Sequence, residues 1–247
     1  KVIVIKVGSN ILVNEKHVLR KKWLSSLIED VKEIQKRGSK IIIVSSGAIA
    51  LGRNILSKKK LTNLHEKQAA ASIGQIQLSQ QWQKAFSKLN IQSSQILITA
   101  EDLNERRKYL NIRNTIYSLM DLDVVPIINE NDTTSTEEIR FGDNDKLSAM
   151  IANALSAELL ILLSDVNGLY TANPKKSVQA KLITSVEEVD QQIEKYIDKD
   201  LSEFGSGGML AKINAAKLCI QSGSTMIISN GLVNNPLNKI DPKSSTW

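Results

Sequence analysis

Two lysines stand in sequence contexts that suit the binding of a phosphate group. Lys6 ends the apolar run 2–5 and precedes Gly8, whose missing side chain lets the backbone approach a ligand closely. Lys212 follows the glycine-rich segment Gly205–Gly208, whose backbone amides can form a concave anion site. The spacing matches neither a Walker A loop nor a dinucleotide-binding loop. Taken singly, each lysine also fits an ordinary solvated position.

The turn Ser45–Ala48 lies between a second apolar run and a helical pattern. Backbone amides at the start of a helix favour a carboxylate or a phosphate, so Ser46 and Gly47 are candidate anion-binding residues. The alternative is that Ser46 only caps the helix.

Carboxylates and side-chain amides are dense in two segments that follow the apolar run 124–128, namely Asn129–Asp132 and Asp143–Asp145. Such a cluster can bind an ammonium group, order lysines or hold a divalent cation. The alternative is a solvated acidic loop that caps the helix beginning at Asp145. The segments lack the ligand spacing and the terminal glutamate of an EF-hand, so we exclude a calcium loop.

These parts together fit phosphoryl transfer, which depends mainly on positioned positive charge and oriented amides and needs no covalent nucleophile. Ser164 and Asp165 end another apolar run and are candidates for contact with the sugar or phosphates of a nucleotide. The residues alone therefore predict a phosphate-handling enzyme.

The elements that must position these residues follow an alternating pattern. Short apolar runs typical of strands buried on both faces are separated by longer segments with helical periodicity. This order predicts right-handed crossovers and an α/β fold, a three-layer α/β/α sandwich with a mainly parallel central sheet. Ligands bind beyond the carboxyl ends of strands in such sheets, where the candidate turns lie. The expected strands are 2–5, 41–44, 96–98, 124–128, 159–163 and 226–228, and the expected helices are 23–34, 65–89 (as one or two), 111–122, 147–155 and 211–221.

Two connecting segments carry less regular patterns. The threonine-rich middle of 129–142 is compatible with a short hairpin, and Gly205–Gly208 is expected to form a loop. The tail from Asn234 has little periodicity, so we expect it to be poorly ordered.

Composition narrows the class of protein. The chain has 247 residues, 42% of them hydrophobic, and a net charge of +6. Only 4% of residues are aromatic and no nucleic-acid motif is present, which argues against a nucleic-acid binder. Cys219 is the single cysteine and is expected to be a small buried hydrophobe. Without a signal-peptide pattern or a membrane-length apolar run, the sequence predicts a cytoplasmic protein that does not bind membranes.

Six segments, taken together and in order, closely resemble the glutamate 5-kinases, a branch of the amino acid kinase family. The resemblance implies the amino acid kinase fold, ATP and Mg²⁺ as cofactors, and ATP-dependent phosphorylation of the side-chain carboxylate of L-glutamate, the first step of proline biosynthesis. The segments are Ile5–Ser9, Val44–Ile49, Ile128–Asp132, Gly142–Asp145, Leu163–Thr171 and Gly205–Met209.

The resemblance also implies residue roles. Lys6 and Lys212 neutralise the transferring phosphoryl group, and Asp145 holds both lysines in place. Magnesium bridges the ATP phosphates with few protein ligands, so no metal-binding residues are expected. The implied glutamate-binding residues are Ser46, Gly47, Ala48, Asn129, Asp132, Asp143 and Asn144, and the implied nucleotide-binding residues are Lys6, Gly8, Ser9, Ser164, Asp165, Ser206, Gly207, Gly208, Met209, Leu210, Ala211 and Lys212.

Many members of this branch continue into a C-terminal PUA domain. We expect residues 1–247 to form a single amino acid kinase domain without a PUA domain. The resemblance further implies feedback inhibition by proline through the loop Thr133–Arg140, a homo-oligomer (dimer or tetramer), and contact with glutamyl phosphate reductase.

Three alternatives remain open from the sequence. A sister kinase would act on N-acetylglutamate, aspartate, carbamate or UMP, but Asp132 favours a substrate with a free ammonium group. A non-catalytic sensor of glutamate or proline would have no need of Lys6, Asp145 and Lys212. A nucleic-acid module is suggested only by the positive net charge.

Overall fold

A central sheet of six strands organises the molecule. The computed structural model describes residues 1–57, 60–135, 143–174, 177–191, 193–194, 196 and 207–247. The strand order is β3-β4-β2-β1-β5-β8, and all neighbouring strands run parallel, as predicted. The strands are β1 (Val2–Val7), β2 (Lys40–Ser45), β3 (Ser93–Ile98), β4 (Val125–Glu130), β5 (Leu159–Ser164) and β8 (Thr225–Asn230).

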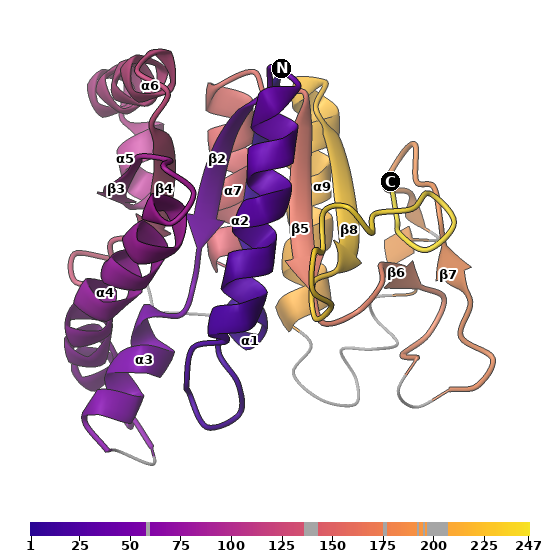
Figure 1. The fold of residues 1–247 in the computed structure, drawn as a ribbon. Helices are drawn as coiled ribbons and strands as arrows, with labels where there is room; N and C mark the ends of the chain where they lie inside the picture. Colours follow the sequence, from indigo (N-terminus) through magenta and orange to yellow (C-terminus); the bar gives the residue numbers. More distant parts are fainter. Residues whose placement is uncertain (58–59, 136–142, 175–176, 192, 195, 197–206) are drawn as a thin grey trace.

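Helices cover both faces of this sheet, which confirms the predicted three-layer sandwich (Figure 1). Side chains of alternate strand positions face opposite layers, so each layer has its own buried cluster. One layer holds α1 (Ser9–Leu12), α2 (Lys21–Lys36), α3 (Ala48–Ile55) and α4 (Leu64–Ser87). The other holds α5 (Ala100–Asn104), α6 (Arg106–Asp121), α7 (Asp143–Ala154) and α9 (Gly207–Ser222).

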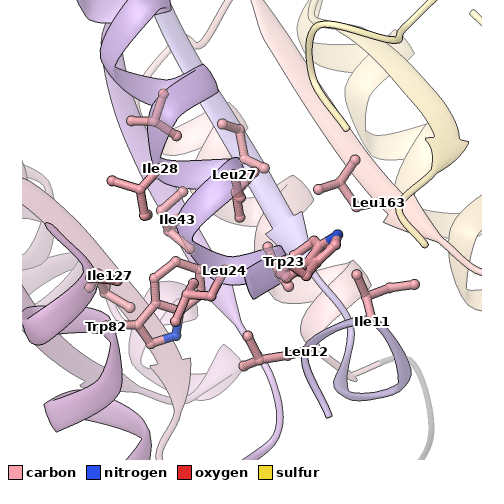
Figure 2. Close-up of a cluster of buried hydrophobic side chains, with 14 of the residues drawn as sticks. Ile11, Leu12, Trp23, Leu24, Leu27, Ile28, Ile43, Trp82, Ile127 and Leu163 are labelled. Atoms are coloured by element: carbon pink, nitrogen blue, oxygen red, sulfur yellow. The ribbon is translucent and has the colours of Figure 1, made fainter. Parts of the chain in front are cut away.

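Helix α2 shows how sequence periodicity becomes packing. Trp23, Leu24, Leu27 and Ile28 recur at helical spacing and are all buried. They face strand side chains that include Ile43 (Figure 2). Each such side chain contributes roughly 1.5–3 kcal/mol when it is removed from water. The helix is therefore held by its apolar stripe.

Helices α3 and α4 cross with their backbones in direct contact. A Cβ atom added to Gly74 would lie 1.8 Å from the carbonyl oxygen of Ala48, and one added to Gly52 would lie 1.8 Å from that of Ala70. Real Cβ atoms do not approach backbone so closely, so only glycine permits this crossing. The crossing places α4 beside the turn that follows β2.

We predict that Gly74→Ala lowers the free energy of unfolding by about 3 kcal/mol, because the new methyl group pushes α3 away from α4. In an exposed helix the same change would stabilise the protein by about 1 kcal/mol. The sign of the change in the free energy of unfolding therefore shows whether the two helices cross closely at Gly74. Urea unfolding followed by circular dichroism measures the effect. Ser72→Ala, at an exposed position of α4, is the matched control and should stay near wild type. A stabilised Gly74→Ala would contradict the close crossing.

The tail after β8 is ordered, and the expectation of poor order is wrong. Buried Asp30 of α2 accepts hydrogen bonds from the backbone amide of Leu237 at 2.9 Å and from the side chain of Asn238 at 2.6 Å. Thr246 forms a β-bridge with Ile228 of β8. The tail is anchored by polar contacts with distant elements, which leave no periodic pattern in the sequence.

Other expectations need smaller corrections. Gly207 and Gly208 lie in the first turn of α9 and not in a loop. The segment 65–89 forms one helix, α4. Helix α5 and a small antiparallel pair, β6 (Leu169–Tyr170) with β7 (Leu182–Ile183), were not expected from the sequence. Of the segment expected to form a short hairpin, Thr133 and Thr134 lie in a turn, and residues 136–142 lie outside the described residues.

Cys219 is fully buried, as predicted, and burial raises its pKa to about 11. A thiol with this pKa stays protonated at neutral pH, so it packs as a small hydrophobe.

Within the described residues, no helix combines the length and the apolar character that crossing a membrane requires.

Candidate active site

The chemically promising residues gather at one edge of the sheet. The carboxyl ends of β1, β2, β4 and β5 meet there because all these strands run parallel. Helices α3, α7 and α9 begin at the same edge, in the lower part of Figure 1. Their first turns direct unpaired amides and the positive ends of helix dipoles at this edge. The edge therefore favours anions.

A buried ion triad lies at the centre of the edge. Val4 packs in the α7/α9 layer, and Lys6, two residues later on β1, points to the same side. Its ammonium Nζ lies 2.5 Å from Oδ1 of Asp145 on α7, and Nζ of Lys212 on α9 lies 2.9 Å from Oδ2. Asp145 is 0% exposed and Lys6 is 8% exposed. Asp145 thus joins residues far apart in the chain and is no solvated capping residue.

The triad carries an excess of positive charge. Burial alone would raise the pKa of the Asp145 carboxyl, but the two adjacent ammonium groups outweigh burial and hold the pKa below its usual 3.8. Burial lowers the pKa of Lys6 below its usual 10.5, and Lys212 adds to this effect while the Asp145 carboxylate opposes it. Two ammonium groups share one carboxylate, which leaves capacity to neutralise an anionic ligand.

Side-chain amides form a second group beside the triad. Asn144 donates from Nδ2 to Oγ of Ser46 at 2.8 Å and to Oδ1 of Asn129 at 3.3 Å. The N-cap residue of α3 is Gly47, in the left-handed region with φ of +117°, and no side chain caps this helix. The alternative that Ser46 only caps α3 is therefore wrong. Its hydroxyl instead links β2 to α7, and Ala48 follows as the first residue of α3.

Two hollows adjoin these amides, between α4 and the strands β3 and β4. The larger, about 480 Å³, is lined by residues that include Gln75, Gln95 and Asp132. The smaller, about 250 Å³, includes Asn129. Among the described residues, the triad lysines line neither hollow. The hollows therefore belong to the amide side of the site.

Gln75 and Gln95 were not among the residues expected from the sequence. They lie on α4 and β3, away from the polar turns, and only the fold brings them together in the lining of the two hollows. The glycine before Gln75 was the one available signal, because it marks the close helix crossing.

The expected nucleotide-binding residues also reach this edge. A Cβ atom on Gly8 would lie 3.5 Å from Nζ of Lys6, so the turn after β1 adjoins the triad. Ser9 begins α1, and Ser164 ends β5 with its hydroxyl 3.4 Å from Oδ1 of Asp165. Lys212 also donates to the carbonyl of Gly208, at 3.4 Å, one turn earlier in α9. The remaining residues of this group in the first turns of α9 are Gly207, Met209, Leu210 and Ala211.

Three expected residues are not fully covered. Ser206 and Arg140 lie outside the described residues. Asp143 begins α7, but its side chain falls outside the described part. Among the described residues, no group of three or more His, Cys, Asp or Glu side chains could hold a metal ion.

Relatives with the same name are similar to this chain over nearly its whole length. A glutamate 5-kinase from Pelagibacter ubique (strain HTCC1062) is 50% identical over 249 residues, which cover 100% of this chain and 68% of that protein. A glutamate 5-kinase from Brucella abortus (strain S19) is 48% identical, and the alignment covers 97% of this chain and 64% of that protein. The chain thus spans about two thirds of the length of the curated relatives it matches.

Solved structures show the same fold at much lower identity. UMP kinase from Ureaplasma parvum aligns with a TM-score of 0.68 at 17% identity, covering 100% of this chain and 97% of that one. Carbamate kinase from Giardia lamblia bound to AMP-PNP aligns with a TM-score of 0.67 at 16% identity, with the same coverage. The sequence pattern of the amino acid kinase family matches residues 1–230. With this match and relatives up to 50% identical, the chain belongs to the amino acid kinase family.

Proposed function

We propose that this chain transfers the γ-phosphoryl group of MgATP to the side-chain carboxylate of L-glutamate and so forms L-glutamyl 5-phosphate, the first step of proline biosynthesis. The observation that carries the proposal is the buried triad of Lys6, Asp145 and Lys212 beside a cluster of amides at the carboxyl edge of the sheet. The similarity to named glutamate 5-kinases supports the choice of acceptor.

The reaction needs charge stabilisation more than proton transfer. The glutamate carboxylate is ionised at neutral pH, so it attacks the γ-phosphorus without a general base. A new carboxyl oxygen–phosphorus bond forms as the bond between γ-phosphorus and the β,γ-bridging oxygen breaks, and that oxygen leaves on ADP. Lys6 and Lys212 neutralise the charge on the transferring group, and Asp145 fixes the positions of both ammonium groups. Magnesium bound to the ATP phosphates supplies further neutralisation.

Glutamate binds on the amide side of the triad in this proposal. Asp132 pairs with the α-ammonium group, and the amides of Gly47 and Ala48 bind a carboxylate at the start of α3. The hydroxyl of Ser46 and the amides of Asn129 and Asn144 already form one hydrogen-bonded group that can orient the substrate. Asp143 completes the expected set.

ATP binds on the other side of the triad. Gly8 and Ser9 offer backbone amides to the transferring phosphoryl group next to Lys6. The first turn of α9, from Gly207, directs its dipole and unpaired amides at the nucleotide phosphates. Ser164, Asp165 and Ser206–Lys212 complete the expected nucleotide set.

We predict that Asp132→Ala raises the KM for glutamate by about 10–100-fold, the loss expected for a hydrogen bond to a charged group. The KM for ATP should stay near wild type, because ATP does not contact Asp132 in this proposal. Asp132→Asn keeps the size but not the charge and should also weaken glutamate binding. Steady-state kinetics with each substrate varied in turn measures both constants. A raised KM for ATP with unchanged glutamate affinity would reverse the assignment of the two sites.

The proposed activity is tested by ADP release from MgATP with a panel of acceptors, in the presence of hydroxylamine. Hydroxylamine converts an acyl phosphate to a hydroxamate, so glutamate-dependent ADP release with hydroxamate identifies the carboxylate as acceptor. N-acetylglutamate, aspartate, carbamate and UMP should be inactive. Activity with one of these alone would move the chain to a sister activity, and no activity from folded protein would favour a non-catalytic sensor.

The proposal extends to regulation, assembly and location. We expect proline to inhibit the reaction through the loop Thr133–Arg140, whose first residue, Thr133, lines the larger hollow. We also expect a dimer or tetramer, contact with glutamyl phosphate reductase, and a cytoplasmic location. Glutamate titrations at several proline concentrations test the first expectation, and a glutamate KM that does not change with proline would exclude it.

A further inference from the structure

A relay of side-chain hydrogen bonds connects helix α4 to the glutamate side of the site. Oε1 of Gln75 accepts a hydrogen bond from Nδ2 of Asn129 at 2.8 Å. Oδ1 of Asn129 accepts from Nδ2 of Asn144 at 3.3 Å, and the same Nδ2 donates to Oγ of Ser46 at 2.8 Å. Gln75 belongs to none of the sequence segments that resemble the family motifs.

One backbone group fixes the direction of this relay. The backbone amide of Glu130 donates to Oδ1 of Asn129 at 2.9 Å, and a backbone N–H can only donate. The oxygen of Asn129 must therefore face Glu130 and Asn144, and its Nδ2 must face Gln75. Asn129 is 3% exposed, so water cannot readily replace the acceptor that Gln75 provides.

The direction of the relay decides what Asn144 presents to a ligand. Its Nδ2 is used by Asn129 and Ser46, and its Oδ1 is buried without a hydrogen-bond partner among the described residues. A buried acceptor without a partner is costly unless a ligand donates to it. A reversed Asn129 amide would offer Nδ2 to Asn144, turn the Asn144 amide over and replace this acceptor with a donor.

Helix α4 holds Gln75, the first residue of the relay, in position. Gly74, next to Gln75, contacts the backbone of α3 so closely that no side chain fits. Gln75 also donates from Nε2 to Oγ of Ser79 at 3.3 Å, one turn later in α4. Its side chain is thus tied to the helix on one side and to Asn129 on the other.

We propose that Gln75 is a positioning residue for glutamate: by accepting from Nδ2 it holds the Asn129 amide in the orientation that the Glu130 backbone amide selects, and so keeps Oδ1 of Asn144 available as an acceptor for a donor group of the substrate. The inference rests on the proposed function. It predicts an effect on glutamate and none on ATP, because Gln75 lies on the amide side of the triad.

Two variants with side chains of similar size distinguish the loss of the hydrogen-bond acceptor from a change in packing. Gln75→Met removes the acceptor and should raise the KM and the calorimetric Kd for glutamate about tenfold, the effect of one buried hydrogen bond. Gln75→Glu keeps an acceptor oxygen and should stay within about threefold of wild type. The KM for ATP should not change in either variant. Equal glutamate affinity in Gln75→Met and wild type would overturn the proposal.

A double variant tests whether Gln75 acts through Asn129. In the Asn129→Ala background the acceptor has no partner, so adding Gln75→Met should change the glutamate Kd by less than about twofold. A full, additive tenfold loss in that background would show that Gln75 acts by another route and would overturn the proposal. Failure of the proposed function would instead show in the wild-type protein, which would bind no glutamate in the same calorimeter.

Discussion

Lys212→Ala should lose about 10²–10³-fold in kcat, the cost expected when one group that stabilises the transition state is removed. Its ammonium group lies 2.9 Å from Asp145 and, in the proposed mechanism, neutralises charge that builds up on the transferring phosphoryl group. The KM for glutamate should change little, because glutamate binds on the amide side. Lys212→Arg keeps the charge but not the geometry, so its kcat should fall between that of wild type and that of Lys212→Ala.

Lys217→Ala is the matched control for this variant. Lys217 lies on the same helix and pairs with Glu194 at 2.6 Å, with 40% of its side chain exposed. Exposed ion pairs contribute little, so this variant should keep wild-type kcat. Stopped-flow or coupled-assay turnover at saturating substrates measures all three variants. Wild-type turnover in Lys212→Ala would remove this lysine from the mechanism.

Asp145→Asn should combine a large loss of stability with a large loss of turnover. The change leaves the ammonium groups of buried Lys6 and partly buried Lys212 without their shared carboxylate. Breaking a buried ion pair by removing one partner costs about 3–5 kcal/mol, which is a large share of the stability of a typical domain. Turnover should fall because the two lysines lose their fixed positions.

The stability difference should depend on pH in a defined direction. The pKa of Asp145 is lower in the folded protein than its usual 3.8, so the folded state binds fewer protons than the unfolded state between these two values. The stabilisation is present above about pH 4 and is lost as the pH falls through the folded pKa. The gap between wild type and Asp145→Asn should therefore narrow below about pH 4, as measured by urea unfolding across pH. A gap that widens on acidification would contradict the triad.

Asp30→Asn provides the control for Asp145→Asn. Asp30 is also fully buried, but it accepts hydrogen bonds from the tail and lies apart from the triad residues. The variant should lose stability because an amide donor would face the tail donors, yet it should keep wild-type kcat at temperatures where it is folded. Equal losses of turnover in the two variants would mean that Asp145 acts only through stability.

Much of the fold follows from local patterns. The side chains of an apolar run such as Ile41–Val44 alternate between the two faces of the sheet, and both faces are buried. The apolar residues between Trp23 and Ile34 in α2 face the core. Local sequence patterns do not predict which distant elements come into contact. The tail residues that bind Asp30 and the α3–α4 crossing at Gly74 were therefore visible only in the folded chain.

The sequence by itself determined the six strands of the central sheet, their parallel direction and the polar turns, because buried strands must be apolar and the chain must turn where each strand ends. Its resemblance to the glutamate 5-kinases also pointed to Lys6, Asp145 and Lys212 as residues of one site. Only the tertiary structure decided that the carboxylate of Asp145 is fully buried between the two lysines and that Gln75 supports Asn129. The physical reason is that burial, distance and hydrogen-bond direction are set by elements packed from opposite ends of the chain, and a single segment contains none of them.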